Sequence, residues 1–512
     1  MKIKSAIYLG LSLLLFEIGA AQPKVLTFDK LKSYTEYFNS IDSEYAVNLV
    51  PNAKAYDWLA QNIPLFDSPD SVLERTYYYR WWAMRKHLKQ TPDGYVFTEF
   101  ITPVNHAGKH NTVSSALGHH IYEGRWLHHQ EYLKQYISFW LFVDAKTPKP
   151  HLRAFSSWLQ NAVYNLYLVN IDRTFLQSLV PALVEDYKQW QAEKKLPNDM
   201  YWQFDVRDAM EESISGGRKE KNIRPTINSY MYGNALALAK IGDVLTADSL
   251  SQYARKAELL KKLIQDSLWD DTATFYKVLL ENRKFSDARE AIGFIPWYFN
   301  LPPDDKKIAN AWDQVIDPTG FDAPWGLTTA ERRHPLFRTH GSGHGCEWDG
   351  PVWPYATTQT LKGLANLLTN YNHHSKMNAS IYYDQLHKYA WSHQKYGKPY
   401  LGEYQDEKNG EWLKGDNPRS SYYNHSGFAD LVISDLVGLK PRSDNILEVH
   451  PLIPEGKWDW FCLDNILYHG KIVTILWDKK GKKYNKGKGF MIFVDGKQLV
   501  KAKQIKYVKA KM

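Results

Sequence analysis

The stretch "DVRDAMEESISGG" at residues 205–217 carries four carboxylates, Asp205, Asp208, Glu211 and Glu212, within eight positions. The aromatic-rich segment "MYWQF" precedes it, and two glycines end it. One interpretation is a solvated acidic turn, which most short acidic runs form. The alternative is proton transfer by one carboxyl group, because an aromatic pocket disfavours the charged form and raises the carboxyl pKa.

A second loop, at residues 324–355, surrounds carboxylates with tryptophan. Trp325, Trp348 and Trp353 lie near Glu347 and Asp349 in this Gly- and Pro-rich segment. The loop is interpreted either as a rigid structure packed by tryptophan or as the wall of a sugar site. Flat apolar rings can stack on the C–H faces of a pyranose, while their polar tips bind hydroxyl groups.

A third loop, "KPYLGEYQDEKNGEW" at residues 398–412, places Glu403 between Gly402 and Tyr404. The "DEKNG" part is typical of an exposed turn, whereas an aromatic setting is less natural for an exposed Glu403. Hydrolysis of a glycosidic bond uses two carboxyl groups from distant parts of a chain. One of them gives a proton to the leaving oxygen, and the other activates water or attacks directly.

Taken in order, the three loops resemble the catalytic half of glycoside hydrolase family 63 and of the mannosylglycerate-hydrolase-like six-hairpin glycosidases. The segment "DAMEES" is similar to the family's acid loop, "EWDGPVWP" to its Tyr-Trp-x-Gly-Pro-x-Trp loop, and "GEYQDEKNG" to its base loop. The following "YYNHSGFADLVISDLVGL" resembles the final barrel helix. The resemblance covers roughly residues 70–440.

The resemblance implies an inverting glycosidase with a carbohydrate substrate and no cofactor. It makes Glu211 the general acid and Glu403 the general base, and Trp348, Trp353 and Tyr404 are expected to shape the pocket. Inverting enzymes separate the two carboxyl groups by about 6.5–9.5 Å. Long capping loops favour removal of a terminal sugar.

Three departures from the family pattern affect the expected sugar subsite. Glu211 stands where the family has Asp, Asp349 where an Arg is common, and "ISGG" where a Pro-Arg pair often follows the acid. These changes indicate a distinct branch with its own substrate.

Further residues are expected to contact substrate. Asp205 and Asp208 could bind sugar hydroxyls or hold Arg207. The remaining candidates are Asp349, Trp325, His425, Glu123 and Arg125. His344 and His425 are interpreted as structural or sugar-binding rather than as metal ligands. In "GHHIYEGRWLHHQ" the histidines form two adjacent pairs, and neighbours on a helix do not face one site. No metal site is expected.

Composition narrows the class of protein. The 512 residues carry a net charge of +8, 14% aromatic residues, 19 Trp, 34 Tyr and only two cysteines, Cys346 and Cys462. Two distant cysteines exclude a disulfide framework. Much of the positive excess lies in residues 478–490 and 500–512, which is explained more simply by a solvated lysine-rich edge than by nucleic-acid binding.

The N-terminal segment, residues 1–21, is typical of a secretory signal peptide. Lys2 and Lys4 precede a short apolar run and small residues, and no cysteine lies near the cleavage point. The run is too short for a comfortable membrane span. We therefore expect a periplasmic or secreted protein without a lipid anchor or a membrane span after cleavage.

Helical patterns dominate residues 22–437, and a short-strand pattern follows in residues 438–512. In residues 226–245 the apolar positions advance by three or four, as one helix face requires. Residues 173–191 do the same, with Pro181 expected to kink the helix or mark its boundary. We expect an (α/α)6 toroid, residues 22–437, followed by a small antiparallel β domain, residues 438–512.

Two other classes of function remain open. A sugar isomerase, epimerase or polysaccharide lyase could use the same toroid. An epimerase would need facing histidines, and a lyase a Tyr/His/Arg set beside a uronic acid. A non-catalytic glycan-binding protein could retain the aromatic pocket, although carboxylates at both catalytic positions argue against it.

Overall fold

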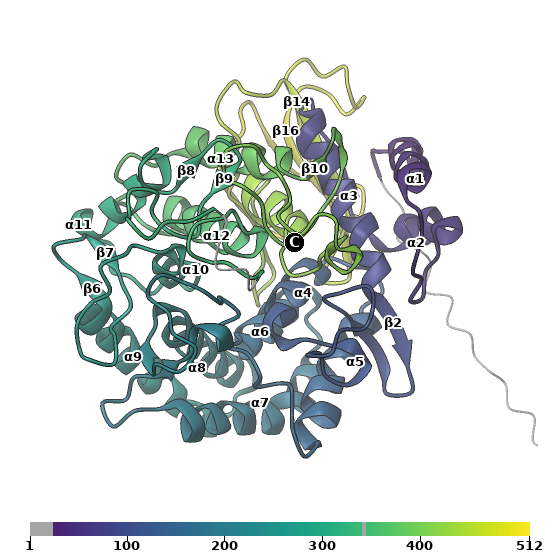
Figure 1. The fold of residues 1–512 in the computed structure, drawn as a ribbon. Helices are drawn as coiled ribbons and strands as arrows, with labels where there is room; N and C mark the ends of the chain where they lie inside the picture. The colour runs from purple at the N-terminus through teal and green to yellow at the C-terminus, as the bar shows by residue number, and fades with distance from the viewer. Residues whose placement is uncertain (1–23, 340–344) are drawn as a thin grey trace, which may run out of the picture.

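The computed structural model describes residues 24–339 and 345–512. The predicted signal peptide therefore lies outside the described residues. The described part is mainly helical and ends in antiparallel sheet (Figure 1). No helix among the described residues combines the length and apolar character that a membrane crossing requires.

The α-helices occupy residues 29–391. They are α1 Asp29–Ile41, α2 Ala55–Asn62, α3 Ser71–His87, α4 Leu117–Gly124, α5 Glu131–Ser138, α6 Leu159–Asn170, α7 Arg173–Lys194, α8 Pro225–Leu245, α9 Gln252–Leu268, α10 Ile295–Tyr298, α11 Lys306–Ala309, α12 Pro354–Asn370 and α13 Ala379–Trp391. The π-helix η11, Leu431–Leu436, follows the third loop. Short 3₁₀ and π segments extend several helices.

Six of these elements share one hollow. Residues of α4, α6, α8, α10, α12 and η11 line a cavity of about 310 Å³ together with Lys440 and Glu448 of the following strands. Other helices pack outside them: α7 contacts both α6 and α8, α9 packs on α8, and α13 packs on both α12 and α3. The three carboxylate-rich segments lie in the stretches of chain that precede α8, α12 and η11.

The helix patterns in the sequence match observed helices. In α8 the predicted face, including Ile227, Met231 and Leu238, is buried. Helix α7 buries Leu176, Leu179 and Leu183 and continues through Pro181 rather than ending there. A proline loses one backbone hydrogen bond in a helix interior, so the packing of this face offsets a local cost of about 3 kcal/mol.

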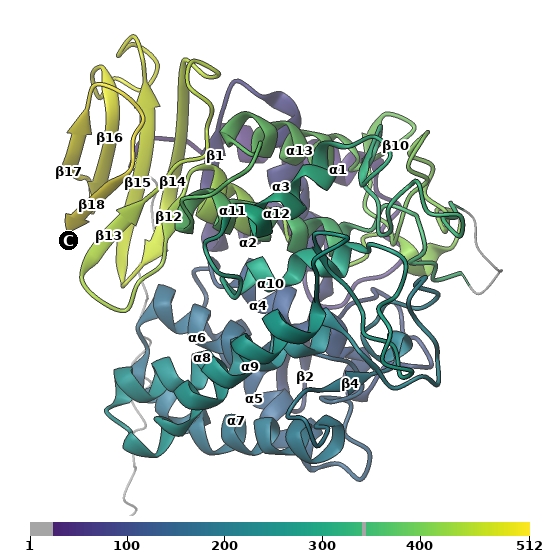
Figure 2. The same ribbon diagram turned by 90° about the vertical axis from the view of Figure 1, so that its left-hand side faces the viewer.

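A five-stranded antiparallel sheet covers one side of the helices (Figure 2). Its order is β1 Leu65–Asp67, β14 Trp460–Tyr468, β15 Lys471–Asp478, β16 Gly489–Val494 and β17 Lys497–Ala502. A three-stranded sheet lies beside it, in the order β12 Leu439–Lys440, β13 Ile446–Val449 and β18 Val508–Lys511. The remaining strands are two to four residues long and pair with one another as two-stranded sheets. They are β2 Leu88–Thr91 with β3 Gly94–Phe97, β4 Trp202–Gln203 with β5 Asn222–Ile223, β6 Trp269–Asp270 with β7 Phe275–Tyr276, β8 Asp322–Ala323 with β9 Gly326–Leu327, and β10 Gln394–Lys395 with β11 Lys398–Pro399.

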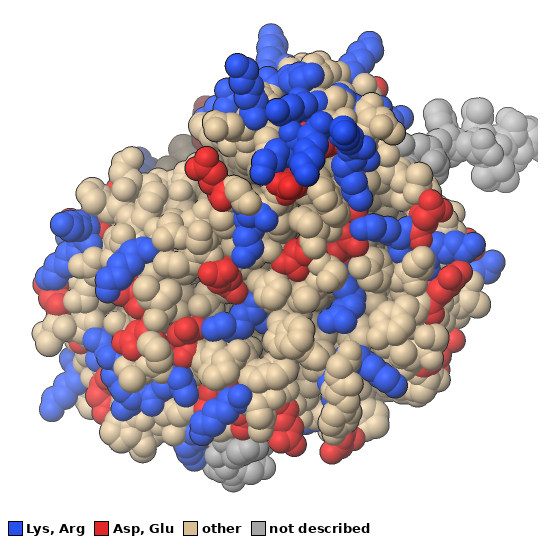
Figure 3. All heavy atoms as spheres, turned by 90° about the horizontal axis from the view of Figure 1, so that it is seen from above, with Lys and Arg blue, Asp and Glu red and all other residues tan. Residues whose placement is uncertain are grey.

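The C-terminal sheet is tied to the N-terminal part of the chain. Strand β1 pairs with β14, with Leu65 opposite Asp464 and Asp67 opposite Cys462. Buried residues of the helices and of one face of this sheet form a continuous apolar cluster, whereas Cys462, Leu476 and Met491 belong to a second, smaller one. The lysines of the C-terminal residues gather on the outer surface of the sheet, at the top of Figure 3. That arrangement fits the solvated lysine-rich edge expected from the sequence.

Candidate active site

A cavity of about 480 Å³ lies where the three carboxylate-rich loops meet. The predicted general acid, Glu211, and the predicted general base, Glu403, both line this cavity, although 192 positions separate them in the sequence. The other lining residues are Glu99, Phe100, His106, Val113, Ser115, Phe155, Val206, Arg207, Ala209, Arg218, Cys346, Trp348, Trp353, Tyr355, Arg419, Tyr423 and His425.

The loop that carries Glu211 is held by its buried neighbours. Met210 is buried, its N–H donates to the carbonyl of Asp205 (3.1 Å), and the Glu211 carbonyl accepts from the Trp348 N–H (3.1 Å). Ala209 and Glu212 adopt left-handed conformations, with φ of 59° and 62°. Such residues cost roughly 1–3 kcal/mol each and persist only where the surroundings enforce them. Together these features turn the Glu211 side chain into the cavity.

The surroundings of Glu211 favour its protonated form. Burial raises the pKa of this carboxyl group to about 7, and the negative charge of Asp205 acts in the same direction. No other side chain in residues 24–339 or 345–512 donates a hydrogen bond to it within normal range. A buried carboxyl group without such donors keeps its proton near neutral pH.

Glu403 has the opposite surroundings. Its carboxylate accepts hydrogen bonds from Lys414 Nζ (2.7 Å) and Ser420 Oγ (2.7 Å), and Arg419 lies 3.9 Å away. The pKa of Lys414 is raised by the negative charge of Glu403 against the effect of burial. A buried carboxylate held by an ammonium group is stabilised in its ionised form. The cavity therefore joins a carboxyl group suited to give a proton with a carboxylate suited to accept one.

A third carboxyl group, Glu99, was not identified from the sequence. Its side chain is buried and accepts hydrogen bonds from Ser115 Oγ (2.7 Å) and from the hydroxyl group of Tyr423. Burial raises the pKa of Glu99 to about 7, and the charges of Glu403 and Glu211 act in the same direction. The segment "VFTEF" could have revealed it, because Glu99 lies among aromatic residues as Glu403 does.

The predicted aromatic residues form a stack beside the cavity. The Trp353 ring is stacked on Trp348 at 4.5 Å on one side and on Tyr404 at 4.6 Å on the other. Trp348 and Trp353 line the cavity, whereas Tyr404 supports them from behind and donates its hydroxyl hydrogen to Glu347. His425 lines the cavity as well, and its ring lies 5.9 Å from Trp353.

Four other predicted contacts lie away from the cavity lining. Asp208 and Arg224 form a completely buried ion pair at 2.7 Å, and Asp205 is buried beneath the acid loop. Asp349 pairs with Arg338. Trp325 packs against Gly410, whose φ of +75° suits glycine and where a Cβ atom would collide with the indole ring. These side chains shape the loops that carry Glu211 and Glu403.

Glu123 and Arg125, at the end of α4, contact the segment that leads into η11. The Glu123 carboxylate accepts hydrogen bonds from the backbone N–H groups of residues 428–430 at 2.9–3.1 Å. Arg125 pairs with Asp430 at 2.7 Å and lines the 310 Å³ hollow, not the cavity of Glu211. Both residues therefore fix the start of η11 against α4.

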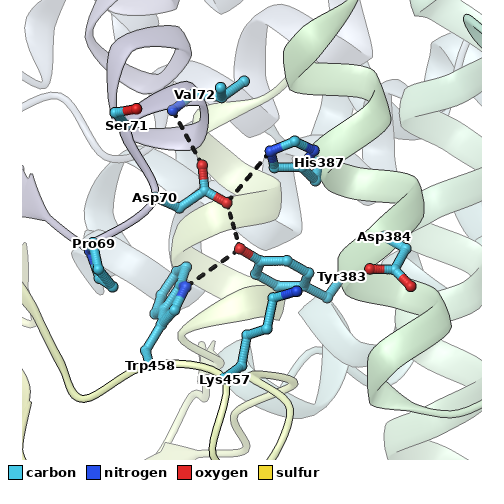
Figure 4. Close-up of a pocket in the computed structure, with 9 residues that line it drawn as sticks. All are labelled: Pro69, Asp70, Ser71, Val72, Tyr383, Asp384, His387, Lys457 and Trp458. Atoms are coloured by element: carbon cyan, nitrogen blue, oxygen red, sulfur yellow. Dashed lines mark hydrogen bonds and ion pairs between the residues drawn. The ribbon is translucent and has the colours of Figure 1, made fainter.

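Another hollow, of about 440 Å³, lies at the junction of α3, α13 and the β region, and Figure 4 shows the residues that line it. Asp70 accepts hydrogen bonds from the Val72 N–H (3.1 Å) and from the hydroxyl group of Tyr383, and His387 lies 3.6 Å away. The Trp458 indole donates to the same hydroxyl oxygen (3.3 Å). These polar groups satisfy one another and join the three elements.

Among residues 24–339 and 345–512, no group of three or more His, Cys, Asp or Glu side chains could hold a metal ion. Burial and nearby positive charge hold the pKa of His425 well below its usual range. His344 lies outside the described residues. Cys346 and Cys462 are both free thiols, so they are not joined to each other.

Comparison with known proteins adds independent information. The family model "Mannosylglycerate hydrolase MGH1-like glycoside hydrolase domain" matches residues 109–426, and the model "Glycosyl hydrolase family 65, C-terminal domain" matches residues 439–501. A solved structure named "Sialidase" is 47% identical and has a TM-score of 0.93 over 95% of this chain, which covers 45% of that one.

More distant structures share the fold alone. A GH63 mannosylglycerate hydrolase from Thermus thermophilus, in complex with glucose, has a TM-score of 0.53 at 13% identity over 70% of this chain and 99% of its own.

Among curated sequences, an uncharacterised protein of Borreliella burgdorferi is 26% identical over 204 residues, which are 40% of this chain and 41% of that protein. The chain thus spans less than half of the sialidase structure and of this curated relative.

Proposed function

Because the chain belongs to the MGH1-like glycoside hydrolase family, we propose that it is an inverting glycosidase with Glu211 as general acid and Glu403 as general base. The observation that carries the proposal is the difference between two carboxyl groups lining one cavity. Burial raises the pKa of Glu211 to about 7, while the Glu403 carboxylate accepts hydrogen bonds from Lys414 and Ser420. Inverting hydrolysis needs this division of protonation states.

In the proposed reaction, Glu211 gives its proton to the oxygen of the leaving group. Glu403 takes a proton from a water molecule, whose oxygen attacks the anomeric carbon from the opposite face. Proton donation leaves Glu211 ionised and proton acceptance leaves Glu403 neutral, so the product complex must exchange both protons with solvent. Lys414 stabilises the Glu403 carboxylate before water is activated.

We propose that the helices form an (α/α)6 toroid with α4, α6, α8, α10, α12 and η11 as its inner ring, in residues 22–437. The shared hollow at one end of these elements and the position of the carboxylate loops at the other support this arrangement. The β strands of residues 438–512, joined by β1, form the second unit. A cavity of about 480 Å³ suits one or two sugar rings, which supports removal of a terminal sugar.

Trp348, Trp353 and His425 are the proposed sugar contacts among the residues expected from the sequence, since they line the cavity. Glu99 joins them as a group that can bind a sugar hydroxyl. We further propose that residues 1–21 direct export of the protein, which would meet its glycan outside the cytoplasm.

A panel of glycans tests the proposal, with wild type, Glu211→Gln and Glu403→Gln compared side by side. Release of a reducing sugar should fall by at least about 10³-fold in both variants, because each lacks one half of the acid–base pair. Full activity in both would overturn the assignment.

The same products distinguish a lyase or an isomerase from a hydrolase. A lyase product absorbs in the ultraviolet through its new double bond, and an isomerase releases no smaller sugar. Tight binding of a glycan without turnover by wild type would instead indicate a glycan-binding protein.

A further inference from the structure

We propose that the glycan bound in the Glu211–Glu403 cavity carries a carboxylate, and that Arg207, Arg218 and Arg419 recognise it. The inference rests on the proposed function of this cavity and adds the chemical class of its substrate, an acidic sugar.

Three guanidinium groups line the cavity from two loops. Arg207 and Arg218 flank Glu211 on the acid loop, and Arg419 lies beyond Glu403 on the base loop. A neutral sugar site usually relies on aromatic rings and a few polar side chains. Three arginines around one small cavity exceed that need, and a guanidinium fork matches the two oxygens of a carboxylate.

The arginines are only weakly engaged within the protein. Arg207 Nη1 lies 3.5 Å from the carbonyl of Ala154, at the limit of a hydrogen bond. The pair between Arg218 Nη2 and Glu212 is long, at 3.3 Å, and 46% of the Arg218 side chain is exposed. These two guanidinium groups therefore keep donors available to a bound molecule.

Arg419 is held in place without being neutralised. Its guanidinium carbon lies 5.3 Å from the centre of the Phe100 ring, while its nearest carboxylate, Glu403, is 3.9 Å away and already bonded to Lys414. The buried Arg419 Nε has no hydrogen-bond partner among residues 24–339 and 345–512. An unpaired buried donor is costly, and an acceptor oxygen from substrate would remove that cost.

The carboxyl groups of the cavity do not cancel this positive charge. Glu403 is compensated by Lys414, and the surroundings of Glu211 and Glu99 favour their neutral forms. The cavity histidines, His106 and His425, also favour the neutral form, in part because Arg419 lies near His106. Glu212 offsets the charge of Arg218, so the excess positive charge that the cavity presents to an entering ligand comes from Arg207 and Arg419, and it attracts an anion.

Binding to the Glu211→Gln protein tests the inference without turnover. The probes are oligogalacturonides, hyaluronan fragments and sialyllactose, each measured by calorimetry beside the same compound with its carboxylates reduced to alcohols. At least one acidic probe should bind about tenfold or more tightly than its reduced form, because charge-assisted hydrogen bonds are roughly twice as strong as neutral ones. The three probes distinguish a uronic acid from a sialic acid.

The triple variant Arg207→Gln/Arg218→Gln/Arg419→Gln, made in the same background, should lose this preference. Arg255→Gln is the matched control, since Arg255 is exposed on α9, and it should leave the preference unchanged. Single variants at the exposed Arg207 and Arg218 should each lower it several-fold, and their melting temperatures should match the parent.

Equal affinity for acidic and reduced probes, binding of no acidic probe, or an unchanged preference in the triple variant would overturn the inference. Its outcome is separate from that of the proposed function. A protein that prefers acidic probes yet hydrolyses none would retain the arginine site and lose the glycosidase assignment. A protein that cleaves neutral glycans and shows no preference for acidic probes would retain the glycosidase assignment and lose the arginine site.

Discussion

Glu211 and Glu403 have the same side chain but different neighbours. Burial and the negative charge of Asp205 favour the neutral form at Glu211, whereas the Glu403 carboxylate accepts hydrogen bonds from Lys414 and Ser420. One consequence is a defined pH dependence. The acid must be protonated, so kcat/KM should fall about tenfold per pH unit as pH rises above the Glu211 pKa of about 7. A pH profile that stays flat to about pH 9 would argue against Glu211 as the acid.

Lys414 gives the second prediction at this scale. Lys414→Met should remove the positive charge that stabilises the Glu403 carboxylate and move the acidic limb of kcat/KM to higher pH. Breaking a buried pair also destabilises a protein by about 3–5 kcal/mol. Lys408→Met serves as a control, because Lys408 is exposed on the same loop. An unchanged acidic limb in a folded Lys414→Met protein would contradict the role given to Lys414.

Glu99 gives the third prediction at the residue scale. In Glu99→Gln no negative charge can develop beside Glu211, so the basic limb should move to lower pH by less than about one unit. The Michaelis constant should rise if Glu99 binds a sugar hydroxyl. The comparison with wild type is made at constant ionic strength, and a basic limb at unchanged pH together with an unchanged Michaelis constant would remove Glu99 from the site.

At the scale of elements, the acid loop depends on a buried ion pair. Asp208→Ala would leave the Arg224 guanidinium, itself completely buried at the start of α8, without its partner at 2.7 Å. The free energy of unfolding should fall by about 3–5 kcal/mol, which urea denaturation measures. The double variant Asp208→Leu/Arg224→Met should recover part of that loss. Unchanged stability in Asp208→Ala, with a loss only of substrate affinity, would instead make Asp208 a sugar contact.

The sequence predicted helices and strands better than it predicted which side chains contact one another. Helical periodicity identified α7 and α8, and the short-strand pattern of residues 438–512 identified β14, β15 and β16, because each pattern is local. The sequence could not distinguish residues that line the cavity from residues that hold the cavity loops in place. Glu123 and Asp208 looked like sugar contacts, but their partners, Phe428 and Arg224, are fixed only by folding. A partner such as Phe428, far along the chain from Glu123, leaves no local signal.

Glu99 and strand β1 were missed for related reasons. Glu99 is a single carboxylate between Phe97 and Phe100. The hydroxyl group of Tyr423 donates a hydrogen bond to it, but Tyr423 follows 324 positions later in the sequence. Strand β1 has only three residues, and its partner β14 comes near the other end of the chain. Neither feature can be recognised from its neighbours alone.

At the scale of the whole molecule, β1 and the shared apolar cluster join the helices to the C-terminal sheet. We therefore expect one cooperative thermal transition for the full chain rather than two. Removal of residues 438–512 would expose the face covered by β14 and β15 and should yield insoluble protein. Two separate calorimetric transitions, or a soluble, folded fragment ending at residue 437, would show that the parts are independent.

The most direct test of the central claim is the configuration of the sugar at the moment of its release. Proton NMR during the first minutes of hydrolysis of an active glycan reports the anomeric signal before mutarotation. The Glu211–Glu403 pair predicts a product of opposite anomeric configuration to the substrate, formed by wild type and not by Glu211→Gln or Glu403→Gln. A product of retained configuration, or the same signal from either variant, would contradict the proposed mechanism.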